Sequence, residues 1–195
     1  MTSGRATARR STTARFVAPD PAAQIALGAV RTRIERCIDL IGRATSWLVL
    51  VIVVLMAINV LLRYTFSEGS VWAQELEWHL LSPLILFGMS YALLHAEHVR
   101  VDVLYAGFSE RNKLRVDLIS AALCIMISAI IIWLSLKYVQ QSWVINEQSA
   151  DPGGLPWRWA LKSLIPIGFT LLILQSVAVA LGVLEKLRAL KGKPA

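Results

Sequence analysis

Four apolar stretches, none of which contains Asp, Glu, Lys or Arg, dominate the sequence. They are 17 to 21 residues long and cover residues 44–62, 80–96, 118–136 and 164–184. A helix needs about 20 apolar residues to cross a bilayer, whereas a membrane strand needs about 9–11 residues of alternating polarity. The sequence therefore predicts an all-α integral membrane protein with four transmembrane helices.

The composition agrees with this fold class and excludes others. Hydrophobic residues make up 56% of the 195 residues and charged residues only 17%, whereas soluble proteins carry about 25% charged residues. This content excludes disorder for most of the chain, and two cysteines exclude a disulfide scaffold. The second stretch is the shortest, but its helix can extend backwards through residues 72–79, where Trp72, Leu76 and His79 share one face.

The basic residues are distributed unevenly around the apolar stretches. Sixteen of the 20 Lys and Arg residues precede the first stretch, lie between the second and third, or follow the fourth. The positive-inside rule therefore places both termini in the cytoplasm. Residues 1–21 and 186–195 are predicted to be basic cytoplasmic tails, the first disordered, with an organellar transit peptide as the alternative for the first tail. Because the basic residues are scattered over three segments, they do not favour nucleic-acid binding.

Residues 22–43 are predicted to form an amphipathic helix on the inner leaflet of the membrane. Apolar residues recur there at helical spacing, among them Val30, Ile34 and Ile38, and charged residues occupy the other positions. Two i,i+4 pairs of opposite charge accompany them, Arg31 with Glu35 and Asp39 with Arg43. Two roles remain open for this helix, a contact with a partner and a membrane-surface anchor.

The sequence carries no pattern typical of a catalytic or cofactor site. All three histidines, His79, His95 and His98, belong to the second helix or its ends, so no other helix supplies a histidine for haem. The sequence also lacks a C-x-x-C pair and a glycine-rich phosphate loop. We therefore predict no enzyme activity, no cofactor and no metal.

The helix interiors favour a scaffold over a transport pathway. Pathways for ions and substrates usually place ionisable residues inside the membrane, and the four stretches contain no Asp, Glu, Lys or Arg. Pro83 and Pro166 each remove a backbone hydrogen bond within about a turn of the outer membrane face, and we expect them to kink two helices near their entry into the membrane. The run Asp151-Pro152-Gly153-Gly154 predicts a turn in the longer outer loop.

Polar residues gather at the two ends of the second helix. Asn59 and Arg63 lie one turn apart at the end of the first helix, and Glu75 begins the second on the same outer side. Because a short connection makes these helices antiparallel neighbours, we expect Arg63 to pair with Glu75 and fix their register, with snorkelling of both charges as the alternative. At the inner end, His98 and Asp102 share a face whether the segment is helical or extended, and we expect a helix end or a partner contact there.

Six short motifs follow one another along the four helices. In chain order they are Asn59-x-x-x-Arg63-Tyr64-x-Phe66, Trp72-x-x-Glu75-Leu76, Gly88-x-x-x-Ala92, His98-Val99-Arg100-Val101-Asp102, Leu155-Pro156-Trp157 and Ile165-Pro166-Ile167-Gly168-Phe169. In order and spacing, these motifs resemble the DctQ-type family, the small membrane subunit of tripartite ATP-independent periplasmic (TRAP) transporters. The resemblance covers about residues 45–185 and leaves the basic extension before them unassigned.

The resemblance implies a role in a three-part transporter. In such systems a soluble periplasmic protein captures an organic anion, a large multispan subunit carries it inward with sodium, and a small four-helix subunit binds the large one. The chain is then expected to brace the large subunit in a bacterial inner membrane. Its implied partners are the large multispan subunit, the periplasmic substrate-binding protein and the lipid bilayer, with no nucleic acid.

On this interpretation the motif residues serve assembly. Gly88 and Ala92 permit close approach of helices, and Trp72 is expected to anchor in the membrane interface. The expected assembly or partner contacts are Asn59, Arg63, Trp72, Glu75, Gly88, Ala92, His98, Asp102, Pro156 and Pro166. Two other classes stay open, a self-assembling four-helix channel or carrier, and a small membrane enzyme or electron-transfer subunit.

Overall fold

The computed structural model describes residues 21–67, 69–95 and 107–191, which form four α-helices and their connections. The helices are α1 (Pro21–Phe66), α2 (Val71–Leu94), α4 (Glu110–Val144) and α5 (Arg158–Lys191). Ser70 caps α2, because its hydroxyl oxygen accepts a hydrogen bond from the Ala73 amide at 3.3 Å. The described ranges contain no strand, so the all-α prediction is confirmed.

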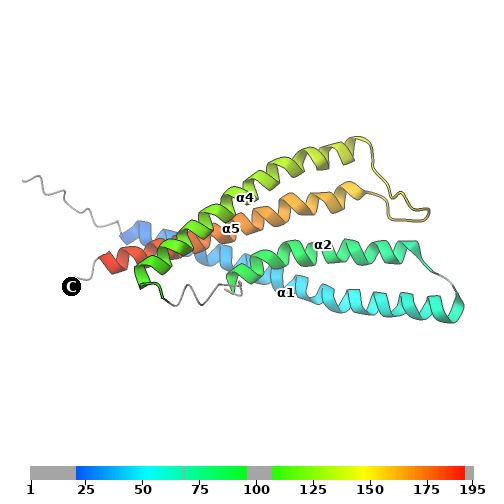
Figure 1. Cartoon of the computed structure of the whole chain (residues 1–195), viewed down its shortest axis with the longest axis horizontal. Coiled ribbons are helices and arrows are strands. Elements are labelled where there is room, and N and C mark those ends of the chain that lie inside the picture. Colours follow the sequence, from blue (N-terminus) through cyan, green and yellow to red (C-terminus); the bar gives the residue numbers. More distant parts are fainter. Residues whose placement is uncertain (1–20, 68, 96–106, 192–195) are drawn as a thin grey trace, which may run out of the picture.

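Over the half of the molecule that carries the hairpin connections, the four helices lie side by side in a row, in the order α4, α5, α2, α1, and toward the other end α1 and α4 cross α5 in this view (Figure 1). α1 and α2 form one antiparallel hairpin, and α4 and α5 form a second through residues 145–157. α5 joins the hairpins, because it packs against α2 as well as α4 and also contacts α1. We call the end that carries both hairpin connections the loop end. The opposite end, where α1 begins and α5 finishes, is the termini end.

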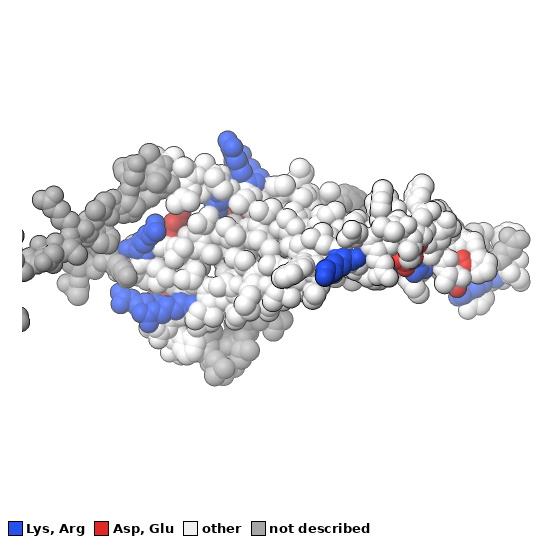
Figure 2. All heavy atoms as spheres, turned by 90° about the horizontal axis from the view of Figure 1, so that it is seen from above, with Lys and Arg blue, Asp and Glu red and all other residues white. Residues whose placement is uncertain are grey.

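Three of the helices are long and apolar enough to cross a membrane, namely Ile25–Phe66, Glu110–Val144 and Arg158–Leu190. α2 has 24 residues and carries Glu75 and Glu77 near its start, so a fourth span stays a prediction. Figure 2 shows charged side chains toward both ends of the molecule, with a broad uncharged band between them. This distribution is typical of a chain whose middle faces hydrocarbon.

The helices continue well beyond the predicted apolar stretches. The amphipathic segment and the first span form a single helix of 46 residues, with no interruption between residues 43 and 44. Pro83 and Pro166 both lie inside helices that continue through them, and the expected kinks at these positions stay a prediction. A proline removes only one backbone hydrogen bond, and membrane helices tolerate this loss when neighbouring turns remain intact.

Small residues form the contacts between helices. Four residues spaced seven apart on α4 are buried, namely Ala121, Ser128, Ser135 and Ser142. A seven-residue spacing keeps them on one side of the helix, and α4 makes its most extensive contacts with α5. Gly168 of α5 lies against Leu86 of α2, and Gly42 of α1 lies against the ring of Tyr91. Small side chains let helix backbones approach closely in this way.

Charged side chains hold the termini end. The two predicted i,i+4 pairs are confirmed: Arg31 Nε lies 2.8 Å from Glu35 Oε1, and Arg43 Nη2 lies 3.0 Å from Asp39 Oδ2. Arg31 also reaches Glu185 of α5 at 3.8 Å, across Gly182. Asp39 lies 3.5 Å from His95 Nε2 at the end of α2. The first half of α1 is therefore tied to both α5 and α2.

Candidate functional site

A buried carboxylate at the loop end connects segments that are far apart in the sequence. The side chain of Glu75 is only 6% exposed. Its Oε1 accepts hydrogen bonds from the Ser149 hydroxyl and, at 2.9 Å, from Arg158 Nη2. Its Oε2 accepts one from the Leu155 amide at 2.5 Å. These four residues, the Glu75 cluster, fasten α2 to the loop between α4 and α5 and to the first turn of α5.

Glycines make this approach of the loop to α2 sterically feasible. A Cβ atom on Gly154 would lie 2.7 Å from Glu75 Oε2 and would overlap Ser149. Gly153 has a φ of +82°, which residues with side chains rarely adopt. The Gly154 amide donates to the Asp151 carbonyl oxygen at 3.0 Å, which confirms the predicted turn.

A second ion pair holds the two ends of the loop together. Lys162 of α5 pairs with Glu147, and its ammonium lies 3.8 Å from the ring centroid of Tyr138 on α4. The rings of Trp143 and Trp159 meet edge to face, with centroids 4.4 Å apart. Opposite charges, a cation–π contact and an aromatic pair thus join α4 to α5 at this level.

The loop-end carboxylates are stabilised in their charged forms. Hydrogen bonds from Ser149 and from the Leu155 amide, together with Arg158, lower the pKa of Glu75 below its ordinary value of 4.5. The hydrogen bond from Lys162 lowers the pKa of Glu147 in the same way. Donors aimed at a carboxylate favour its ionised form. Both groups therefore remain charged at neutral pH.

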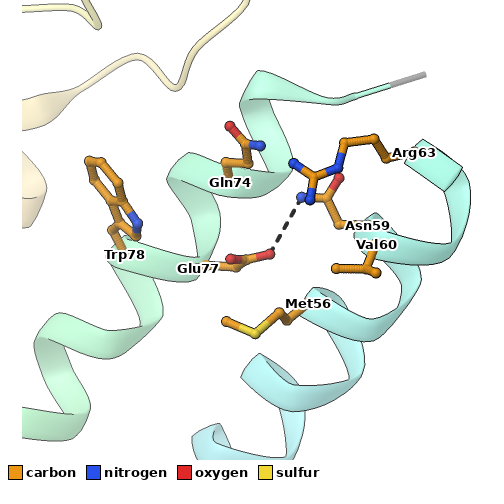
Figure 3. Close-up of a pocket in the computed structure, with 7 residues that line it drawn as sticks. All are labelled: Met56, Asn59, Val60, Arg63, Gln74, Glu77 and Trp78. Atoms are coloured by element: carbon orange, nitrogen blue, oxygen red, sulfur yellow. Dashed lines mark hydrogen bonds between the residues drawn. The ribbon is translucent and has the colours of Figure 1, made fainter. Parts of the chain in front are cut away.

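A pocket of about 270 Å³ opens between α1 and α2 at the same end (Figure 3). Its polar wall contains Asn59 and Arg63 of α1 with Gln74 and Glu77 of α2, and its apolar wall contains Met56, Val60 and Trp78. The Asn59 side-chain amide donates to Glu77 Oε1 at 3.5 Å, at the limit of a hydrogen bond.

The predicted pair between Arg63 and Glu75 is wrong. Arg158 is the ion-pair partner of Glu75 instead. The Arg63 guanidinium lies 5.6 Å from the ring centroid of Tyr64 and lines the pocket. Helical geometry explains the error. Residues 75 and 77 point about 200° apart on a helix, so Glu75 faces α5 and Glu77 faces α1.

Arg158, Ser149, Glu147, Lys162 and Glu77 have roles at this end that sequence reasoning missed. All but Glu77 depend on α5 packing beside α2 or on the shape of the loop. The position of Arg158 directly after Leu155-Pro156-Trp157 was the available signal.

The other predicted contacts are spread over the molecule. Gly88 and Ala92 are half-buried, and a Cβ on Gly88 would meet no described atom within 4 Å. Within the described chain the close approaches occur at Gly42, Gly168 and Gly182 instead. Contacts of Gly88 and Ala92 with a partner therefore stay a prediction.

Trp72 is 48% exposed, Pro156 is exposed in the loop, and Pro166 is half-buried within α5. His98 and Asp102 lie outside the described residues. Among the residues that the structure describes, no three His, Cys, Asp or Glu side chains are grouped to hold a metal ion.

Comparison with known proteins identifies the family. The family description "Tripartite ATP-independent periplasmic transporters, DctQ component" matches residues 52–186, close to the range over which the motifs resemble it. No curated protein matches the sequence. Since the match covers well over half of the chain, the protein belongs to the family of DctQ components of tripartite ATP-independent periplasmic transporters.

Proposed function

We propose that this membrane protein is the scaffold subunit that braces the large multispan subunit of a sodium-coupled transporter. The transporter takes up organic acids delivered by a periplasmic binding protein, across a bacterial inner membrane. The observation that carries the proposal is the helix row, in which long apolar helices lie side by side and leave most of their surface uncovered. The family match supports the choice of transporter class.

The uncovered surface is extensive. Only 6% of the most apolar part of α1 and 17% of that of α4 are buried, against 33% in the central α5. A row has two broad faces, so a second membrane protein can pack along several helices at once. Transporters whose domains slide need a part that stays fixed while another moves, and a row fastened by the Glu75 cluster supplies such a part.

Copurification tests whether the chain binds and braces a large multispan subunit. The tagged chain is isolated from its native membranes in mild detergent, and the retained proteins are identified and quantified by mass spectrometry. We expect a large multispan protein in fixed ratio with the chain. A homo-oligomer that retains no such protein in several gentle detergents would refute the brace, and the chain would then be assayed for transport alone.

The proposed orientation can be tested with a thiol that the chain already has. Cys37 is exposed on the first half of α1, and Cys124 lies partly buried in α4. With both termini in the cytoplasm, a membrane-impermeant maleimide should label Cys37 in inverted vesicles and spare it in intact cells. Cys37→Ser provides the control for labelling at Cys124. Labelling of Cys37 in intact cells would show that the first half of α1 faces the outside, opposite to the proposed orientation.

A further inference from the structure

The pocket between α1 and α2 contains two opposite charges that do not neutralise each other. Arg63 and Glu77 both line it, yet no ion pair among the described residues involves either group. Among the residues that the structure describes, Glu77 accepts one side-chain hydrogen bond, the long one from Asn59. Charges beside a low-dielectric region are costly unless they are paired. The pocket therefore offers one cationic and one anionic subsite.

The pocket lies at the depth of lipid headgroups. Glu75, two residues before Glu77, forms an ion pair with Arg158. Trp159, the residue after Arg158, packs against Trp143. Trp78, which lines the pocket, is 69% exposed. Tryptophan rings collect where hydrocarbon meets headgroups, so this level of the row corresponds to the membrane interface.

The pocket is most polar toward the loop end. Arg63 lies nearest the loop end, and Met56 lies about two turns closer to the middle of the row. The Arg63 side chain bends back so that its guanidinium ends beside Asn59, across from Gln74 (Figure 3). The guanidinium thus lies at the loop-end side of the pocket, Glu77 lies deeper, and Met56 closes the side where acyl chains begin.

We propose that this pocket binds the headgroup of a phosphatidylethanolamine lipid. The primary ammonium pairs with the Glu77 carboxylate, and the phosphate pairs with the Arg63 guanidinium, with Asn59 and Gln74 as further hydrogen-bond partners. Arginine suits phosphate because its planar donors match two oxygens. A phosphatidylglycerol headgroup supplies no cation for Glu77, and a choline headgroup donates no N–H hydrogen bond. A single basic side chain of a partner protein would leave Arg63 without an anion.

Native mass spectrometry of the purified full-length chain tests this assignment. The chain is delipidated in mild detergent and titrated separately with phosphatidylethanolamine, phosphatidylcholine and phosphatidylglycerol of identical acyl chains. We expect phosphatidylethanolamine to bind about tenfold more tightly than the other two, the size expected for one charge-assisted hydrogen bond. Glu77→Gln should reduce its binding by about tenfold, and Arg63→Gln should reduce it similarly.

Matched controls separate the pocket from general charge effects. Glu110→Gln removes an exposed carboxylate at the start of α4, and Arg36→Gln removes an exposed guanidinium from α1. Both should bind phosphatidylethanolamine as the unmodified chain does. Val60→Phe fills the pocket without changing its charge and should also displace the lipid. This variant keeps the test decisive if either charge variant fails to fold.

Three results would overturn the proposal. Equal binding of the three lipids would show that the pocket does not select a zwitterionic primary amine. Unchanged lipid binding in both Glu77→Gln and Val60→Phe would place the bound lipid elsewhere. Full competition by soluble O-phosphoethanolamine at concentrations equal to those of the lipid would assign the pocket to a water-soluble ligand.

Discussion

The two ends of the helix row are held by ion pairs of very different character. At the loop end, the Glu75 side chain is 6% exposed and its partners come from residues more than 70 positions away. At the termini end, Asp39 and Arg43 are 29% and 71% exposed and lie one helical turn apart. Exposed pairs contribute about 0–1 kcal/mol, whereas a buried charge that loses its partner is strongly destabilising. The loop end therefore depends on a buried long-range cluster, whereas the termini end is held by more exposed pairs, two of them local and two between helices.

Removing the buried carboxylate should have the largest effect. Glu75→Ala leaves Arg158 without its charged partner and frees the loop from α2, so we expect a large drop in the thermal unfolding midpoint and in the yield of the transporter complex. The unfolding midpoint and the yield are both measured on protein extracted from its membranes in the same detergent. Asp39→Asn removes a paired carboxylate charge from the termini end and should lower the midpoint only slightly.

Substrate preference provides a separate readout of the Glu75→Ala variant. Because the scaffold is not proposed to contact substrate, uptake should fall without any change in which organic acid is preferred. A changed preference would contradict the brace. An equally harmful Asp39→Asn would show that the two ends do not differ as described.

Glycine substitutions should come next in size. Gly154→Ala forces a methyl group onto Glu75 and Ser149, and Gly42→Ala forces one into the ring of Tyr91. Overpacking of this kind costs about 1–3 kcal/mol, measurable as reduced thermal stability. Gly28→Ala is the control, because its methyl would meet no described atom within 4 Å. Unfolding at lower temperature for Gly28→Ala than for Gly154→Ala would contradict the packing described here.

Acid should loosen the loop end through its two carboxylates. The pKa values of Glu75 and Glu147 in the folded chain lie below the ordinary value of 4.5. Their stabilising contribution is therefore complete above pH 4.5 and is lost as pH falls through the folded pKa values. The protection factor of the Leu155 amide against hydrogen exchange, which corrects for the intrinsic pH dependence of exchange, should fall on acidification below that pH. A protection factor that does not change with pH in Glu75→Gln would identify the carboxylate as the cause, whereas a fall in both proteins would point to another group.

The smallest effect on stability is expected for Gly88→Ala. A methyl group there meets open space within the described chain, and alanine favours a helix by up to about 1 kcal/mol. The purified chain should be equally or slightly more stable. A lower yield of the complex with unchanged stability would locate a partner helix at Gly88. A normal yield would remove Gly88 from the predicted assembly contacts.

The sequence was informative about helices and turns because these depend on local patterns. Uninterrupted apolar stretches predicted helices, and Asp151-Pro152-Gly153-Gly154 predicted the turn that the structure contains. The helices are longer than the apolar stretches. Hydropathy marks where a helix is apolar, whereas α4 and α5 extend into the polar sequence beside their apolar stretches.

The partners of the charged residues could not be predicted in the same way. Sequence neighbours α1 and α2 were correctly expected to pack together, and Arg63 was therefore assigned to Glu75. In the structure Glu75 forms its ion pair with Arg158, because α5 packs on the other side of α2. Which helix lies beside α2 depends on the packing of the whole row, and a single sequence carries no direct signal of it.

The order of synthesis gives the Glu75 cluster a consequence for biogenesis. The ribosome completes α1 and α2 long before it reaches Ser149, Leu155 and Arg158, the groups that satisfy the carboxylate. Chains fold from the N-terminus as they emerge, so the Glu75 carboxylate is hydrated at the membrane surface until these partners have been synthesised. The hairpin of α4 and α5 then closes over it, and a chain cut short before this hairpin would keep an open, charged edge.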